Sequence, residues 1–148
     1  MAQATAISPQ ALIDIAKATV TTYNDRDWTK ARTILTPDFV YDEVATGRKV
    51  NGADQAIDLW KSWAQAFPDS KGTIQNARAT ADGTVIVEVT WKGTHKGPLS
   101  TPSGPIAPTG KPIEVRACAV LEMSGERARI ERHYFDMATM LRQIGVNG

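Results

Sequence analysis

Residues 112–135 read PIEVRACAVLEMSGERARIERHYF, and this stretch decides the class of fold. In its first part, apolar or small residues alternate with mostly polar ones, and Ser124-Gly125 supplies residues that suit a tight hairpin turn. A period of two places one set of side chains on a core and the other set on a more polar face. The stretch therefore predicts a hairpin of two antiparallel strands.

The segments before this hairpin indicate helices first and further strands later. Ser8-Pro9 is typical of a helix start, and apolar residues recur at helical spacing from Leu12 to Tyr23. We expect helices at 9–23, 27–36, 53–67 and 137–141, and strands at 38–44, 72–80, 84–95, 112–123 and 127–135. This order predicts an α+β domain in which a curved antiparallel sheet wraps over helices as a cone. The apolar interior of such a cone is a common place for a small-molecule pocket.

Size and composition limit the class of protein. The 148 residues fit a single domain, 1–148, in which we expect 1–8 and 146–148 to be flexible termini. A net charge of +1 without an isolated basic run disfavours nucleic acid as a partner. The single cysteine, Cys118, excludes an internal disulfide and suits a reducing compartment. With no signal-peptide pattern and no apolar run long enough for a membrane span, we expect a cytoplasmic protein away from membranes.

One segment, residues 92–112, is unusually long for a connection between strands. It contains five of the eight prolines and four glycines. Loops of this length inside compact domains are usually lids, binding loops or disordered segments. Because proline is stiff, we expect an ordered excursion, either over a pocket mouth or across a subunit contact.

The end of the last predicted strand carries most of the acid–base chemistry. A neutral imidazole at His133 can accept a proton near neutral pH, and this makes it the candidate base. Alternation from Ile130 places His133 on the opposite face, so a β-bulge would be needed to turn it inward. Asp136 either orients His133 or only caps the last helix. By the same alternation Tyr134 lies on the side of Ile130, as a core residue or a pocket residue.

For the other candidate site residues, a purely structural role is an alternative to a functional one. His95, in a glycine-flanked turn, is either a hydrogen-bond donor at the pocket mouth or a residue that stabilises the turn. Four aromatic residues have spacing that suits either a flat cavity or an ordinary core: Tyr41, Trp60, Trp63 and Trp91. The histidines and Cys118 lack metal-ligand spacing, so no metal is predicted. Glu88, Glu114 and Arg116 share the polar face of the sheet, where we expect cross-strand pairs or a subunit contact.

Four sequence blocks together resemble the SnoaL-like polyketide cyclases (ester cyclases) of the nuclear transport factor 2-like superfamily. They are FPDS at 67–70, WKGTHKG at 91–97, APTGKPIEV at 107–115 and DMATMLRQIG at 136–145, and the resemblance covers residues 9–145. It implies an α+β barrel-like cone, a homodimer without cofactor, and a small hydrophobic or polyaromatic, polyketide-like ligand. Characterised members close a ring by an intramolecular aldol step.

The same resemblance implies roles for particular residues. The acid–base position, an aspartate in known cyclases, falls on His133, and a second family acid falls on Asp136. A histidine of the preceding strand in those enzymes falls on Cys118 or Ala119. We therefore expect a cyclase or isomerase acting on a carbonyl-rich small molecule, with a non-catalytic carrier domain as the alternative.

A third hypothesis comes from the tail block RHYFDM at 132–137, which also resembles limonene epoxide hydrolases. Their arginine and aspartate on an inner strand fall on Glu88 and Thr90. This makes an epoxide hydrolase the minor alternative.

Overall fold

The computed structural model describes residues 7–146 and confirms the α+β architecture. Residues 1–6 and 147–148, on which most of the expectation of flexible termini rests, lie outside this range. The helices are α1 (Pro9–Asp25), α2 (Trp28–Thr33), α3 (Ala53–Ala66) and α4 (Met137–Gln143). The strands are β1 (Leu35–Glu43), β2 (Arg48–Asn51), β3 (Lys71–Ala79), β4 (Val85–Thr94), β5 (Pro112–Ser124) and β6 (Arg127–Phe135).

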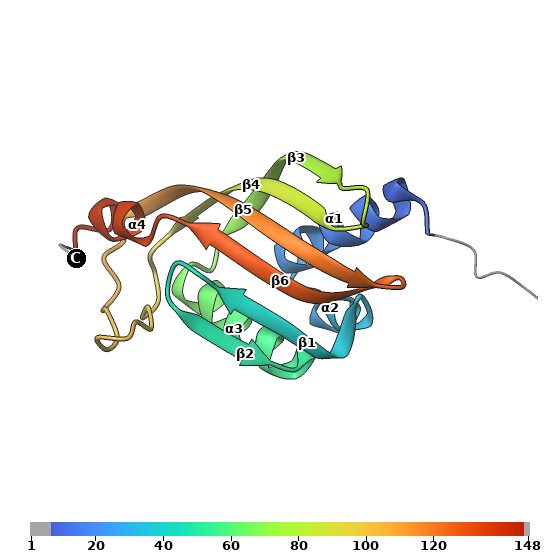
Figure 1. Ribbon diagram of the computed structural model, residues 1–148. Coiled ribbons are helices and arrows are strands. Elements are labelled where there is room, and N and C mark those ends of the chain that lie inside the picture. Colours follow the sequence, from blue (N-terminus) through green and yellow to red (C-terminus); the bar gives the residue numbers. More distant parts are fainter. Residues whose placement is uncertain (1–6, 147–148) are drawn as a thin grey trace, which may run out of the picture.

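The six strands form one curved, unclosed sheet in the order β2-β1-β6-β5-β4-β3 (Figure 1). The expectation of a purely antiparallel sheet is wrong at one place, because β1 runs parallel to β6. The other neighbouring pairs are antiparallel. Two details at the first strand also differ from the prediction: Leu35 belongs to β1 instead of the second helix, and the short strand β2 was not predicted.

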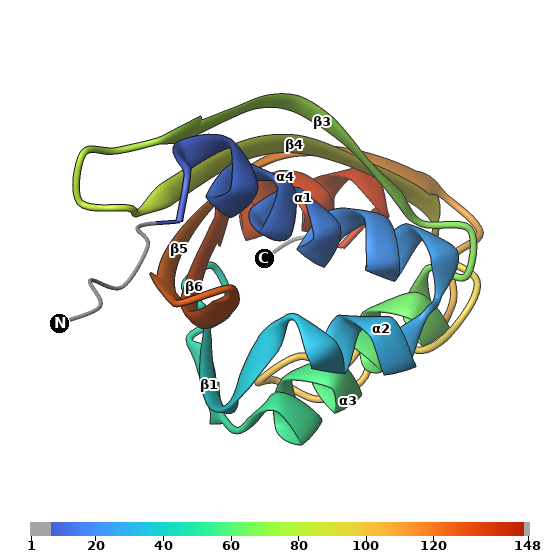
Figure 2. The same ribbon diagram turned by 90° about the vertical axis from the view of Figure 1, so that its right-hand side faces the viewer.

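Helices cover the concave side of this sheet (Figure 2). Helix α1 packs on β3 and β4, and α3 packs on β1 and β2. The start of α1 is set by Ser8, whose hydroxyl accepts a hydrogen bond from the Ala11 N–H at 3.1 Å. Gly52 precedes α3 with φ 101°, a conformation that strongly favours glycine. No helix among residues 7–146 combines the length and apolar character needed to cross a bilayer.

A bulge in β6 decides which of its side chains face the helices. Ile130 pairs with Glu122 and Ala128 pairs with Met123, so Arg129 is an extra residue between the two pairs. Ala128 is fully buried before the bulge, and Glu131 and His133 are buried after it. The bulge lies before Ile130 and turns Ile130 away from the helices, so His133, which alternation places opposite Ile130, faces them.

The 92–112 segment is an ordered excursion at the end of the molecule where α4 lies (Figure 1). Leu99 and Ile106 form an isolated antiparallel bridge within it. The Leu99 side chain is buried in an apolar cluster with Phe67, Ile113 and Met140. Since these three residues also line the internal cavity described below, the loop supports one wall of that cavity from behind.

Candidate functional site

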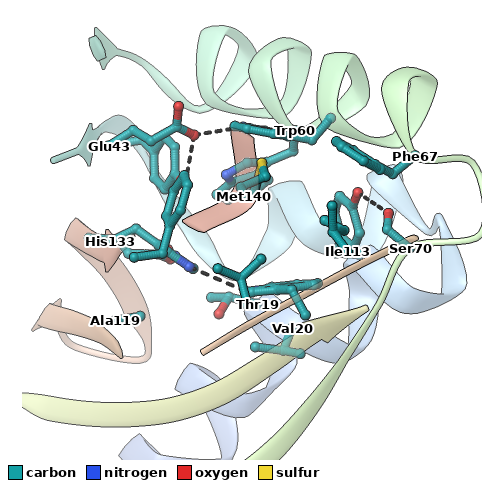
Figure 3. Close-up of a pocket in the computed structure, with 17 residues that line it drawn as sticks. Thr19, Val20, Glu43, Trp60, Phe67, Ser70, Ile113, Ala119, His133 and Met140 are labelled. Carbon is teal, nitrogen blue, oxygen red and sulfur yellow. Dashed lines mark hydrogen bonds and ion pairs between the residues drawn. The ribbon is translucent and has the colours of Figure 1, made fainter. Parts of the chain in front are cut away.

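An internal cavity of about 90 Å³ lies between the concave face of the sheet and the helices (Figure 3). Most of its lining is aromatic or aliphatic. The lining residues that carry a polar group are Thr19, Tyr23, Tyr41, Glu43, Trp60, Trp63, Ser70, Trp91, Glu131 and His133. Figure 3 shows Glu43 and His133 on one side of the cavity and Phe67 and Ile113 on the other. The cavity is thus apolar with its acid–base groups concentrated on one wall.

His133 forms a hydrogen-bonded series with Glu131 and Trp91. The indole N–H of Trp91 donates to His133 Nε2 at 3.3 Å. Because Nε2 accepts this bond, the imidazole proton lies on Nδ1, which donates to Glu131 Oε2 at 2.9 Å. Both Glu131 and His133 are almost completely buried. The imidazole is thus held with Nδ1 bonded to Glu131 and Nε2 directed at Trp91, and all three residues line the cavity.

Glu43 is a second buried carboxylate, and all its acceptor positions are in use. Its Oε1 accepts hydrogen bonds from Thr46 Oγ1 at 2.6 Å and from Arg48 Nη2 at 2.7 Å and Nε at 3.1 Å. Its Oε2 accepts from Trp63 Nε1 at 2.7 Å and from the Tyr41 hydroxyl at 3.2 Å. Such a saturated, ion-paired carboxylate fixes the wall and has no free lone pair for a ligand.

Two tyrosine hydroxyls at the cavity remain protonated. Burial, reinforced by the charges of Glu43 and Glu131, raises the pKa of Tyr41 well above its ordinary value of 10.0. Burial also raises the pKa of Tyr23, against the opposing effect of its hydrogen bond to Ser70. The Tyr23 and Ser70 oxygens are 2.6 Å apart. These groups are therefore neutral hydrogen-bonding groups and not bases.

The structure brings five of the predicted site residues together. His133, Tyr41, Trp60, Trp63 and Trp91 all line the cavity. The aromatic residues both line the cavity and pack in the core, since Trp60 and Tyr41 belong to the apolar core as well. Their edge-on ring contacts, such as that between Tyr41 and Trp60 with centroids 5.5 Å apart, make the walls rigid.

Three predicted residues lie on the outer face of the sheet instead. Asp136, Cys118 and Tyr134 line a hollow there together with Glu88 and Arg116. The expectation that Tyr134 is a core residue is wrong: its exposed fraction is 42%. The reason is the extra residue in β6, which sends Tyr134 outward while it sends its neighbour inward.

Asp136 acts as the N-cap of α4. Its carboxylate accepts hydrogen bonds from the Thr139 N–H at 3.2 Å and the Thr139 hydroxyl at 2.7 Å. These bonds hold the pKa of Asp136 below its ordinary value. No hydrogen bond joins Asp136 to His133 among the contacts described for residues 7–146, so the capping role is the one its geometry supports.

His95 stabilises the base of the long loop. Its Nδ1 accepts a hydrogen bond from the Thr109 N–H at 3.2 Å, and its backbone pairs with Lys111 and Gly110. The ring is fully buried beside Phe67 and is not part of the cavity lining. Burial lowers the pKa of His95. The turn-stabilising role therefore fits the contacts of His95, and the pocket-mouth position does not.

Sequence reasoning missed Glu43 and Glu131. Each continues an inward row of its strand: Glu43 follows Phe39 and Tyr41 at a period of two, and Glu131 precedes His133. A carboxylate in phase with buried aromatic residues is the signal that could have found them, because such a charge must have partners inside. Within residues 7–146, no three His, Cys, Asp or Glu side chains gather as metal ligands.

The family model for SnoaL-like polyketide cyclases matches residues 13–144, which is most of the chain. The chain belongs to the SnoaL-like polyketide cyclase family. No curated protein sequence matches it. Family membership supports a cyclase or isomerase type of role and leaves the substrate open.

Solved structures share the fold. A protein of Jannaschia sp. CCS1 assigned to the same family has a TM-score of 0.81 at 18% identity, covering 99% of this chain and 100% of that one. A Catenulispora acidiphila protein with a ketosteroid isomerase-like fold, in complex with trimethylamine, has a TM-score of 0.76 at 20% identity, covering 90% and 93%. A limonene epoxide hydrolase-like enzyme of M. tuberculosis has a TM-score of 0.70 at 18% identity, covering 92% and 90%.

The positions that would carry the epoxide hydrolase machinery lie away from His133. Glu88 lines the outer hollow, and the Thr90 hydroxyl donates to Gln75 on the adjacent strand. Both alternate with inward-facing residues of β4. The positions that match the epoxide hydrolase machinery therefore lie outside the cavity.

Proposed function

We propose that this protein is a cofactor-independent cyclase or isomerase that acts on a small, hydrophobic carbonyl compound of polyketide type. The observation that carries the proposal is the buried dyad of His133 and Glu131 at an apolar cavity. A cavity of about 90 Å³ favours a small ligand over a polyaromatic one.

The proposed reaction needs only proton transfers. His133 Nε2 removes a proton from a carbon next to a carbonyl group, and the C–H electron pair becomes an enolate. In a cyclase the enolate carbon then attacks a second carbonyl group of the same molecule, and the imidazolium returns its proton to the new alkoxide oxygen. In an isomerase the proton returns to a different carbon. Both sequences balance without an oxidant or a reductant.

Glu131 and Trp91 support these steps in different ways. Glu131 fixes the tautomer with the proton on Nδ1, and its negative charge stabilises the imidazolium that forms. The bond from the Trp91 N–H to Nε2 is long, at 3.3 Å, so a ligand can replace it. The freed indole N–H is then a donor for the carbonyl oxygen on which negative charge develops.

The test is exchange of carbon-bound hydrogen for deuterium in D₂O. We expect the wild-type protein to accelerate this exchange, followed by ¹H NMR, for one or more members of a panel of small cyclic and acyclic β-diketones. His133→Gln should lower the rate by about 10²–10⁴-fold because the general base is lost. Cys118→Ala, on the outer face, is the matched control and should retain the wild-type rate. Exchange that persists in folded His133→Gln protein would exclude His133 as the base.

A carrier domain without chemistry is the second candidate. It is favoured by one observation, that the Nε2 lone pair is already occupied by the Trp91 N–H. In that case, a ligand would bind to the cavity with no acceleration of exchange in the wild-type protein. His133→Gln would then change affinity only.

A further inference from the structure

One buried carboxylate oxygen, on a residue that lines the cavity, has no hydrogen-bond partner among the described residues. Among residues 7–146, the buried side-chain atoms without a partner are Thr36 Oγ1, His95 Nε2 and Glu131 Oε1. Of these three residues, Glu131 alone lines the cavity. Its exposed fraction is 4%, so solvent outside the protein does not satisfy it. Buried polar atoms in native proteins are almost always hydrogen-bonded, so this exception requires an explanation.

The contrast with Glu43 shows how unusual the exception is. Glu43 accepts hydrogen bonds from four residues and pairs with the guanidinium of Arg48. Glu131 accepts a bond only at Oε2, from His133 Nδ1. A carboxylate with a single neutral donor is poorly compensated for its removal from water. The wall of the cavity therefore holds two carboxylates: both oxygens of Glu43 accept hydrogen bonds, whereas Oε1 of Glu131 accepts none.

The donors around Glu131 are already directed elsewhere. The hydroxyl of Tyr41, on the neighbouring strand, donates to Glu43, and the indole N–H of Trp91 donates to His133. Leu121, its cross-strand partner on β5, has no side-chain donor. Among residues 7–146 no group donates to Oε1, so the remaining source of a donor is a molecule inside the cavity, either water or a ligand.

We propose that Glu131 Oε1 binds a hydroxyl or N–H group of the ligand. This inference deepens the proposed function, on which it rests for the identity of the reacting carbonyl, by narrowing the substrate class. The substrate would carry a hydrogen-bond donor as well as a carbonyl group. Because the other oxygen of the same carboxylate holds His133, the donor lies near the carbon that loses its proton. Hydroxylated or enolic carbonyl compounds meet this requirement, and purely ketonic ones do not.

Equilibrium binding of three single-ring probes tests the proposal. Phenol offers a donor, benzaldehyde offers only an acceptor, and toluene offers neither. We would measure their dissociation constants by NMR titration with the wild-type protein and with Glu131→Gln. Dividing each value by that for toluene, and then comparing the two proteins, removes differences in ring burial and probe hydration.

Replacing Glu131 with glutamine should reverse the preference of the site from probes that donate a hydrogen bond to probes that accept one. Its amide oxygen would accept the Nδ1–H of His133, so its NH₂ group would take the place of Oε1 and turn an acceptor into a donor. We expect the affinity of phenol relative to toluene to fall about tenfold or more, which is typical of losing a hydrogen bond to a charged group. The relative affinity of benzaldehyde should rise. Glu131→Asp, which keeps the acceptor, should keep the preference for phenol.

Two results would overturn the proposal: phenol that gains no advantage from Glu131, or relative affinities that do not change in Glu131→Gln. If that variant fails to fold, Glu131→Leu takes its place, because leucine has no acceptor: a relative affinity of phenol equal to that of the wild type would then overturn the proposal. These probes undergo no reaction, so the outcome is independent of the exchange assay. If the wild-type protein accelerates exchange but Glu131→Gln leaves the relative affinity of phenol unchanged, this inference alone is refuted. If Glu131→Gln lowers the relative affinity of phenol but the wild type does not accelerate exchange, the proposed function alone is refuted.

Discussion

Replacing Glu43 with glutamine is the sharpest test of how the cavity wall is held. The variant keeps the size of the side chain and removes its charge. Glutamine has one oxygen where Glu43 has two, so its NH₂ group must face either the Arg48 and Thr46 donors or the Trp63 and Tyr41 donors. In both orientations, at least two donors lose their acceptor.

The expected loss of stability follows from burial. Removing one partner of a fully buried ion pair typically costs about 3–5 kcal/mol, because the other charge is left uncompensated. The Arg48 side chain is 28% exposed while that of Glu43 is completely buried, so the guanidinium can regain some water. We therefore expect a decrease in the free energy of unfolding of about 2–3 kcal/mol. For a domain of this size this corresponds to a fall of about 6–9 °C in the melting temperature.

Urea unfolding and calorimetry of Glu43→Gln measure this loss. Glu122→Gln is the matched control, since Glu122 pairs with Arg129 and Arg132 at the surface, with distances of 3.1 and 2.6 Å. An exposed pair of this kind contributes about 0–1 kcal/mol. If Glu43→Gln costs no more than Glu122→Gln, the Glu43 cluster does not stabilise the wall and our reasoning about it fails.

Two further predictions concern residues that the structure places outside the cavity. Burial lowers the pKa of His95 below its ordinary value of 6.5, so its stabilising contribution is present above pH 6.5 and is lost as the pH falls. The melting temperature of the wild type should therefore fall more between pH 7.5 and 5.5 than that of His95→Gln, and equal falls would contradict this. Asp136→Ala should remove the N-cap of α4, at a cost of about 1 kcal/mol in urea unfolding, and leave the deuterium exchange rate unchanged. A large loss of exchange in this variant would return Asp136 to the catalytic site.

The sequence predicted helices and strands well wherever their hydrophobic periodicity extended over enough residues. The strand expected at 127–135 coincides with β6, and the helix start at Ser8-Pro9 coincides with that of α1. Strand β2 was missed because four residues, Arg48–Asn51, are too few to show a period. The parallel pairing of β1 with β6 was also beyond prediction, because it depends on strands that are far apart in the sequence.

The candidate site was only partly predictable, for a physical reason. His133 and the four cavity aromatics were identified by residue type. Glu43 and Glu131 were not, because a charged residue in a strand is ordinarily placed on the solvent side. Their burial depends on partners that sequence spacing does not reveal: Trp63 lies twenty positions from Glu43 on another element.

The inward position of the His133–Glu131 dyad depends on one additional residue in β6. Without Arg129 as an unpaired residue, the alternation that buries Ala128 would continue through Ile130 and Arg132, and it would place His133 in the outer hollow. The bulge therefore exchanges an apolar residue and an arginine for a carboxylate and an imidazole at the cavity wall. The exchange places a carboxylate where an apolar side chain would stand, and a buried carboxylate requires hydrogen-bond partners that an apolar residue does not. The His133–Glu131 dyad is buried although one oxygen of Glu131 has no donor. Binding of a ligand in the cavity explains this arrangement better than the stability of the fold does.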